Sequence, residues 1–228
     1  MAGVAGGLLG GSGPTGAGTA VRELPRQASI ICPASTALVL ESAAGRQAQR
    51  VDGARRIHME DLAQVRDFYP ERKYEGSFET AAALVFRRQD LDSYLEFIWR
   101  LFFSFVIGNG DMHLKNISLI YRNPRRPVIS PAYDLVSTAP HRLIEMEDFG
   151  LKLCHSRRFE SIGPHSFYRL AQRVGAPVDA TREAVDAVAA CLPEAWEQVS
   201  DLLKVLPEHR KWLAERIPKV VQRFSACE

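Results

Sequence analysis

Apolar residues recur at helical spacing through much of the chain, and the strongest such run spans residues 92–107. Its apolar positions fall three or four residues apart, which is typical of a helix with a wide buried face: Tyr94, Ile98, Leu101, Phe102, Phe105 and Val106. Asp90 or Asp92 can cap its start, and Gly108 can end it, because glycine readily adopts the left-handed backbone that closes helices. We predict a central, largely buried helix here.

Further segments show the same spacing. Ser77 is placed to cap a helix that ends at Phe86, with Glu79 in its first turn, and Asp61 to Val65 indicates a short helix start. Beyond His165 the chain is predicted to be helical again, with boundaries at Asp179 and at Leu192-Pro193. The expected segments are 167–174, 180–191, 193–203 and 208–224.

One stretch alternates instead, as a half-buried strand does. Ile117 to Tyr121 alternates apolar and polar positions, Asn123-Pro124 favours a turn, and Pro127 to Ser130 supplies a returning strand. We therefore expect a mainly α fold with one short β-hairpin and no internal repeat.

The first fifty residues have a different character. Residues 1–20 are rich in glycine and carry no charge, which is typical of a flexible, low-complexity tail. Residues 21–50 form a poorly defined segment with one strand-like run, Thr36 to Glu41. The packed domain is expected to occupy residues 51–228.

Composition narrows the class of protein. The hydrophobic and charged fractions, 46% and 25%, match an ordinary globular protein, and the net charge of +2 gives no reason to expect direct nucleic-acid binding. The longest apolar run, Leu101 to Ile107, is far shorter than the roughly 20 residues that cross a membrane. A cytoplasmic location, with no membrane contact, is expected. The four cysteines show no CxxC spacing and suit a reducing compartment: Cys32, Cys154, Cys191 and Cys227.

The strongest chemical signal is the loop after the central helix. Asp111 lies five positions before Asn116, and Asp134 follows the predicted hairpin, which would return it to the same cleft. In phosphoryl transfer one carboxylate orients the attacking hydroxyl, while an amide oxygen and a second carboxylate hold Mg²⁺. We expect Asp111 to accept or orient a hydroxyl proton, and Asn116 and Asp134 to hold the metal.

Other residues of the loop leave alternatives open. His113 could hydrogen-bond the loop backbone or act at the phosphate, and Lys115 could be a solvated charge or a phosphate contact. A single aspartate after a helix is commonly a turn former, so Asp111 acquires its functional interpretation from Asn116 and Asp134.

In its wider context this loop resembles the catalytic loop of HipA-family serine/threonine kinases, the toxin components of bacterial toxin–antitoxin pairs. The matching run is FVIGNGDMHLKNISL, residues 105–119. A later run, PAYDLVSTAP at residues 131–140, is similar to the metal-binding segment of that family. Residues 55–64, with Lys73-Tyr74-Glu75, resemble the start of its helical lobe, and the resemblance covers roughly residues 50–220.

The resemblance implies a kinase-like C-terminal lobe and a role for each motif residue. Asp111 matches the catalytic aspartate, with His113 and Lys115 as further catalytic candidates. Asn116 and Asp134 match the metal ligands, and Asn109 and Asn116 are the candidate cofactor contacts. The implied cofactors are ATP and Mg²⁺, the acceptor is a protein hydroxyl, and the usual partner is a HipB-like DNA-binding antitoxin.

The sequence shows no motif that corresponds to the N-lobe, the part of such kinases that covers the nucleotide. That lobe covers ATP with a Gly-rich loop and supplies a lysine to the phosphates, whereas the first lysine here is Lys73. Gly11 to Gly16 does spell GxGxxG, but it follows no convincing strand and no lysine follows it. We expect a truncated kinase lobe that is weakly active or inactive alone, for which a separate N-lobe subunit is a candidate partner.

Two other functions are compatible with the loop. Small-molecule phosphotransferases of the aminoglycoside and choline kinase type also carry GDxHxxN, although Lys115, Ser118 and the 131–140 run fit the HipA pattern better. A degenerate lobe could also bind an antitoxin or an N-lobe partner without catalysis.

Overall fold

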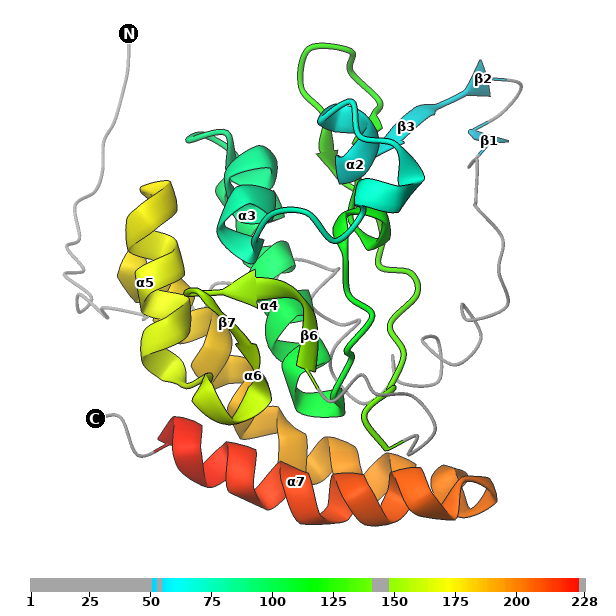
Figure 1. The fold of residues 1–228 in the computed structure, drawn as a ribbon, viewed down its shortest axis with the longest axis vertical. Coiled ribbons are helices and arrows are strands. Elements are labelled where there is room, and N and C mark those ends of the chain that lie inside the picture. The colour runs from blue at the N-terminus through cyan, green and yellow to red at the C-terminus, as the bar shows by residue number, and fades with distance from the viewer. Residues whose placement is uncertain (1–50, 53–54, 141–147, 226–228) are drawn as a thin grey trace, which may run out of the picture.

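The computed structural model describes residues 51–52, 55–140 and 148–225. The predicted tail 1–20, the segment 21–50 and the strand Thr36 to Glu41 lie outside these residues. Helices dominate the described part, which confirms the expected mainly α fold (Figure 1). They are α2 (Leu62–Val65), α3 (Phe78–Phe86), α4 (Leu91–Ile107), α5 (Pro164–Val174), α6 (Val178–Val199) and α7 (Pro207–Ser225), with short 3-10 turns η3 (Pro70–Arg72), η4 (Leu114–Asn116), η5 (Phe159–Ser161) and η6 (Leu202–Val205).

The strands of the described residues form three small antiparallel sheets. They are β1 (Val51–Asp52) with β2 (Arg55–Arg56), β3 (His58–Asp61) with β4 (Ser118–Tyr121) and β5 (Val128–Ile129), and β6 (Asp148–Leu153) with β7 (Ser156–Arg158). The predicted hairpin is β4–β5. Strand β3, which the sequence did not predict, pairs along the other edge of β4, with Asp61 opposite Ser118.

Helix α4 is the centre of the fold and packs against α3, α6 and α7. The Asp90 carboxylate caps its start by accepting a hydrogen bond from the Ser93 N–H at 3.0 Å. Gly108 ends it in the left-handed conformation, at φ +65°. Both ends therefore lie where the sequence predicted, and three of the four phenylalanines between them are buried: Phe97, Phe102 and Phe105.

A buried ion pair ties α4 to the hairpin. The Arg100 guanidinium donates to Glu96 Oε1 at 2.6 and 2.8 Å and to the Ser130 carbonyl at 2.6 Å. Burial lowers the pKa of Arg100, and the neighbouring Glu96 carboxylate opposes that shift. Since Ser130 directly follows β5, this pair sets where the hairpin lies against the central helix.

One predicted helix boundary is wrong. Leu192-Pro193 was expected to separate two helices, but α6 continues through Pro193 to Val199. Proline removes one backbone hydrogen bond from a helix interior. Here Val188, Ala189 and Leu192 are buried against neighbouring helices, so packing outweighs the local defect.

The β6–β7 hairpin was not predicted. Phe149, Leu151 and Leu153 alternate inward on β6, which is the period of a strand with one buried face. Its two-residue turn is Cys154-His155, both at positive φ, where asparagine and glycine are the usual residues. The turn therefore carried no recognisable signal.

In the described ranges no helix combines the length and the apolar character needed to span a bilayer. Cys154 and Cys191 are thiols.

Candidate functional site

The loop that carries Asp111 starts at the C-terminal end of α4 and is held by the segment after Asp134. Gly108 accepts hydrogen bonds from the Thr138 and Ala139 N–H groups at 3.2 and 3.0 Å. The Thr138 hydroxyl in turn accepts from the Gly110 N–H at 2.8 Å. These hydrogen bonds join the segment that precedes Asp111 to the segment that follows Asp134.

Asn109 shapes this loop from inside. Its side chain is fully buried, and its Oδ1 accepts a hydrogen bond from the Asp111 N–H at 3.1 Å. Its Nδ2 is buried without a hydrogen-bond partner. The predicted cofactor contact of Asn109 stays a prediction, while the geometry shows it holding the backbone of Asp111.

Strand β6 packs closely behind the same loop. A Cβ atom placed on Gly150 would lie only 2.5 Å from the Met112 carbonyl oxygen. Glycine is needed at this position because the two backbones approach so closely. The loop therefore has a rigid wall on this side.

Asp111 is held by a residue that the sequence did not single out as functional. Its Oδ1 accepts a hydrogen bond from the Tyr74 hydroxyl. Burial, reinforced by that hydrogen bond to Asp111, raises the pKa of Tyr74 to about 12, so the phenol stays a donor at neutral pH. The Lys73-Tyr74-Glu75 run was visible in the sequence, but nothing local to it points at Asp111.

His113 lies at the centre of the charged groups. Its Nε2 is 3.8 Å from Asp111 Oδ1, and its ring meets the Tyr74 ring edge-on at 5.1 Å between centroids. Burial and the Lys73 charge lower the pKa of His113, against the opposing effect of Asp111 and Asp134. The imidazole is therefore neutral at pH 7, and both aspartates of the motif are close enough to act on it.

Asn116 and Asp134 are in direct contact. The Asn116 Nδ2 donates a hydrogen bond to Asp134 Oδ2, and its Oδ1 accepts from the His113 N–H at 2.8 Å. Asp134 is exposed and adopts a left-handed backbone at φ +57°. The hairpin thus brings these side chains together, as the sequence led us to expect.

Tyr133 fixes this arrangement. Its hydroxyl donates to the Lys115 carbonyl at 2.6 Å and also contacts the Ser118 hydroxyl. These bonds tie the segment that carries Asp134 to the turn that carries Asn116. The Lys115 side chain is half-buried on this turn, and its predicted role stays a prediction.

The donor set suits a hard cation shared with phosphate. Mg²⁺ prefers oxygen ligands and is commonly held by one or two carboxylates together with substrate phosphates. Asp134 offers an exposed carboxylate, and Asn116 Oδ1 keeps a second lone pair besides the one used by His113. Within the described residues no group of three or more His, Cys, Asp or Glu lies together.

A buried helix that leads into an Asp-x₄-Asn loop, and a hairpin that returns a second aspartate, define a kinase-like C-terminal lobe. The chain matches the family described as HipA-like C-terminal domain over residues 20–196. The chain belongs to this family, which confirms the resemblance of its motifs.

Several relatives bear names that point to the same class. The chain is 39% identical over 136 residues to "Putative kinase Y4dM" of Sinorhizobium fredii, covering 57% of this chain and 33% of that protein. It is 30% identical over 94 residues to a "Putative kinase" of Haemophilus influenzae, covering 37% and 27%. The chain therefore spans about a third of the length of these curated relatives.

A solved structure shares the fold. It is the HipA, HipB and operator DNA complex of the Shewanella oneidensis MR-1 toxin–antitoxin system, with a TM-score of 0.64 at 19% identity. The similarity covers 79% of this chain and 48% of the solved chain. The kinase-like fold thus rests on an independent structural comparison.

Proposed function

We propose that the chain is the C-terminal lobe of a HipA-type serine/threonine protein kinase, which transfers the γ-phosphoryl group of ATP to a protein hydroxyl. The observation that carries the proposal is the contact between Asn116 and Asp134, on the same loop system as Asp111. Phosphoryl transfer depends mainly on positioning and charge neutralisation, and these three side chains have the chemistry for both.

Asp111 orients the acceptor in this proposal. Tyr74 holds one carboxylate oxygen, which fixes the rotamer and leaves the other oxygen to receive the acceptor hydroxyl. The hydroxyl oxygen forms a bond to the γ-phosphorus as the bond to the ADP oxygen breaks, and its proton passes to Asp111. Tyr74 is therefore a positioning residue.

Asn116 and Asp134 hold the metal. When bound, Mg²⁺ neutralises phosphate charge and orients the nucleotide. Tyr133 and the His113 N–H keep both ligands in place before the nucleotide arrives. Since burial lowers the pKa of His113, a charged contact of its imidazole with phosphate is disfavoured, and its Nδ1 is buried without a hydrogen-bond partner.

The 228 residues are proposed to be weakly active alone. No lysine precedes Lys73, so the phosphate anchor and the lid over the nucleotide would come from another lobe. Because the fold matches a HipA chain whose solved complex contains HipB and operator DNA, a HipB-like antitoxin is the proposed regulatory partner.

Calorimetry of nucleotide binding tests the metal assignment. ATP binding by the chain should strengthen on adding Mg²⁺, and Asp134→Ala should abolish that gain, with a loss of about tenfold or more. Asp92→Ala removes an exposed carboxylate from the first turn of α4 and serves as the control. An unchanged Mg²⁺ dependence in Asp134→Ala would show that the metal ligands are misassigned.

A second experiment separates the candidate activities. The chain, with Mg²⁺ and ATP, is offered protein acceptors, aminoglycosides and choline. Asp111→Asn should lose phosphotransfer to protein and keep nucleotide binding. Transfer to the small molecules alone would replace the proposed kinase by a small-molecule phosphotransferase, and a cellular phenotype that survives Asp111→Asn would indicate a binding module.

A further inference from the structure

The connection between α6 and α7 exposes apolar side chains in an unusual concentration. Of the five large apolar residues that are strongly exposed in the described ranges, three lie between residues 202 and 206. Leu202 is 56% exposed, Val205 81% and Leu206 44%. Single exposed apolar residues are ordinary on a protein surface, but a cluster of them marks a contact surface.

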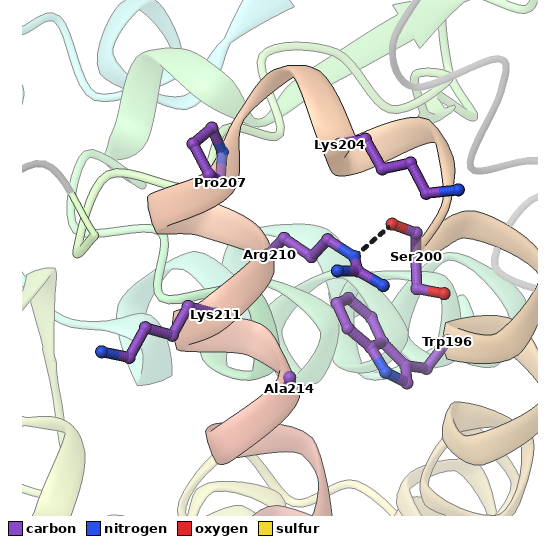
Figure 2. Close-up of a pocket in the computed structure, with 7 residues that line it drawn as sticks. All are labelled: Trp196, Ser200, Lys204, Pro207, Arg210, Lys211 and Ala214. Atoms are coloured by element: carbon purple, nitrogen blue, oxygen red, sulfur yellow. Dashed lines mark hydrogen bonds between the residues drawn. The ribbon is translucent and has the colours of Figure 1, made fainter.

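A surface pocket of about 440 Å³ lies beside this cluster, between the end of α6 and the start of α7. Figure 2 shows Arg210 reaching from α7 across to Ser200 at the end of α6, with the Trp196 ring beside it. The pocket is lined by Trp196, Ser200, Lys204, Pro207, Arg210, Lys211 and Ala214.

The pocket lining is cationic. It contains three basic side chains and no carboxylate. Lys204 pairs with Asp201 at 3.1 Å, but both side chains are largely exposed, and such surface pairs are weak. Arg210 Nε donates to the Ser200 carbonyl at 2.9 Å, which fixes the guanidinium at the pocket, while Lys211 extends away from it into solvent (Figure 2).

We propose that this surface, the α6–α7 corner, binds an acidic segment of a partner protein that also carries apolar side chains. The carboxylates would meet Arg210 at the pocket and Lys211, whose side chain extends from the pocket edge into solvent, and the apolar side chains would cover Leu202 and Val205. The basic side chains of the pocket lining favour acidic groups there, and the exposed apolar cluster favours a protein segment over a bare polyanion. This proposal rests on exposed side chains of the α6–α7 corner and on no phosphotransfer chemistry, so it does not depend on the proposed function.

Fluorescence anisotropy with a defined probe tests the proposal. The probe is a labelled, amphipathic 14-residue peptide, with glutamates on one helical face and leucines on the other. Matched probes replace glutamate by lysine, or leucine by serine, and a single-stranded oligonucleotide supplies negative charge alone. The glutamate–leucine peptide should bind with a Kd in about the micromolar range, as is usual for small transient interfaces, and more weakly at high salt.

Variants locate the binding. Lys211→Glu and Val205→Ser alter exposed side chains, so the chain should still fold, and each should weaken binding about fivefold to tenfold. The matched controls are Arg125→Glu and Val128→Ser, an exposed cation and an exposed apolar residue at the β4–β5 hairpin, which should change binding less than twofold.

The possible outcomes are distinct. Binding that the α6–α7 variants weaken and the hairpin variants leave intact supports the proposal. Equal binding of the oligonucleotide, or equal loss in both pairs of variants, would overturn it, as would the absence of saturable binding. Circular dichroism of each variant confirms that the fold is retained.

Discussion

Gly108 is the first residue of the loop that carries Asp111, and it combines a left-handed backbone with a closed space. A Cβ atom there would lie 2.4 Å from the Trp212 ring and 2.8 Å from the Ala139 side chain. We expect Gly108→Ala to lower the free energy of unfolding by about 2–4 kcal/mol, through strain and overpacking together. Urea unfolding measures the change.

Two other glycines serve as controls that separate backbone strain from overpacking. Gly175 also has positive φ, at +73°, but opens onto free space, so Gly175→Ala should cost only the backbone strain of about 1 kcal/mol. Gly163 has an extended backbone and open space, so Gly163→Ala should cost neither strain nor overpacking, only the loss of a preferred N-cap residue, below about 1 kcal/mol. If Gly108→Ala cost no more than Gly175→Ala, the contact with Trp212 would not constrain the loop.

Under the proposed function, Tyr74 offers a prediction about phosphotransfer. Tyr74→Phe keeps the ring against His113 and removes the hydrogen bond to Asp111. We expect the phosphotransfer kcat to fall about tenfold, because the carboxylate loses its fixed orientation, while the KM for ATP and the urea midpoint barely change. Tyr69→Phe, at an exposed site, is the control. If the urea midpoint of Tyr74→Phe fell together with kcat, the loss of activity would reflect unfolding, and the role of Tyr74 would be purely structural.

At the scale of elements, the buried pair of α4 connects the central helix to the hairpin. Removing one partner leaves the other charge buried without compensation, so Arg100→Met and Glu96→Leu should each cost about 3–5 kcal/mol. The double variant should cost clearly less than the sum of the two, because it leaves no buried charge. A double-mutant cycle from chemical unfolding measures this, and strict additivity would show that the pair does not act as a unit.

Local signals predicted the elements that have local causes. Ser77, Asp90 and Gly108 mark helix ends by their own side chains or backbone preference, so α3 and α4 could be bounded from sequence. Pro193 gave a misleading boundary because the buried face of α6 that precedes it, up to Leu192, outweighs one missing hydrogen bond. Strand β3 was missed because its partner, β4, lies far along the chain.

The candidate site also has parts with local causes, which the sequence predicted, and parts that depend on tertiary contacts, which it did not. The spacing of Asp111 and Asn116 is a local pattern, and the hairpin made the approach of Asp134 predictable. Tyr74 and Tyr133 were missed because their roles arise from tertiary contacts: Tyr74 lies 37 residues from the aspartate that it holds. Sequence spacing identifies the chemistry here, while packing determines which residues hold it in place.

At the scale of the whole molecule, α7 supports the loop that carries Asp111, and we call these contacts of α7 the brace. Arg216 donates to the Val106 and Phe105 carbonyls at 3.0 and 2.7 Å, which satisfies the last turn of α4. On the same helix, His209 lies 3.2 Å from the Ser137 carbonyl and Trp212 closes the space over Gly108. One helix therefore holds both segments of the motif.

This brace should be measurable. Arg216→Lys cannot reproduce two fork-like bonds, so it should lower the free energy of unfolding by about 1–2 kcal/mol and weaken Mg²⁺-dependent nucleotide binding. Arg223→Lys, on the same helix, loses a bond to the Ile162 carbonyl instead and should affect stability alone. Equal nucleotide affinity in the two variants would exclude a role of α7 in shaping the site.

The brace also has a consequence for the order in which the chain is made. Residues 207–225 follow every motif residue, so a nascent chain can expose the whole Asp111-to-Asp134 region while α7 is still inside the ribosome. Until α7 emerges, the Trp212 ring does not cover Gly108, and the last carbonyls of α4 receive no hydrogen bond from Arg216. The motif segments are therefore synthesised before the helix that contacts them, and their native packing can be completed only after α7 has left the ribosome.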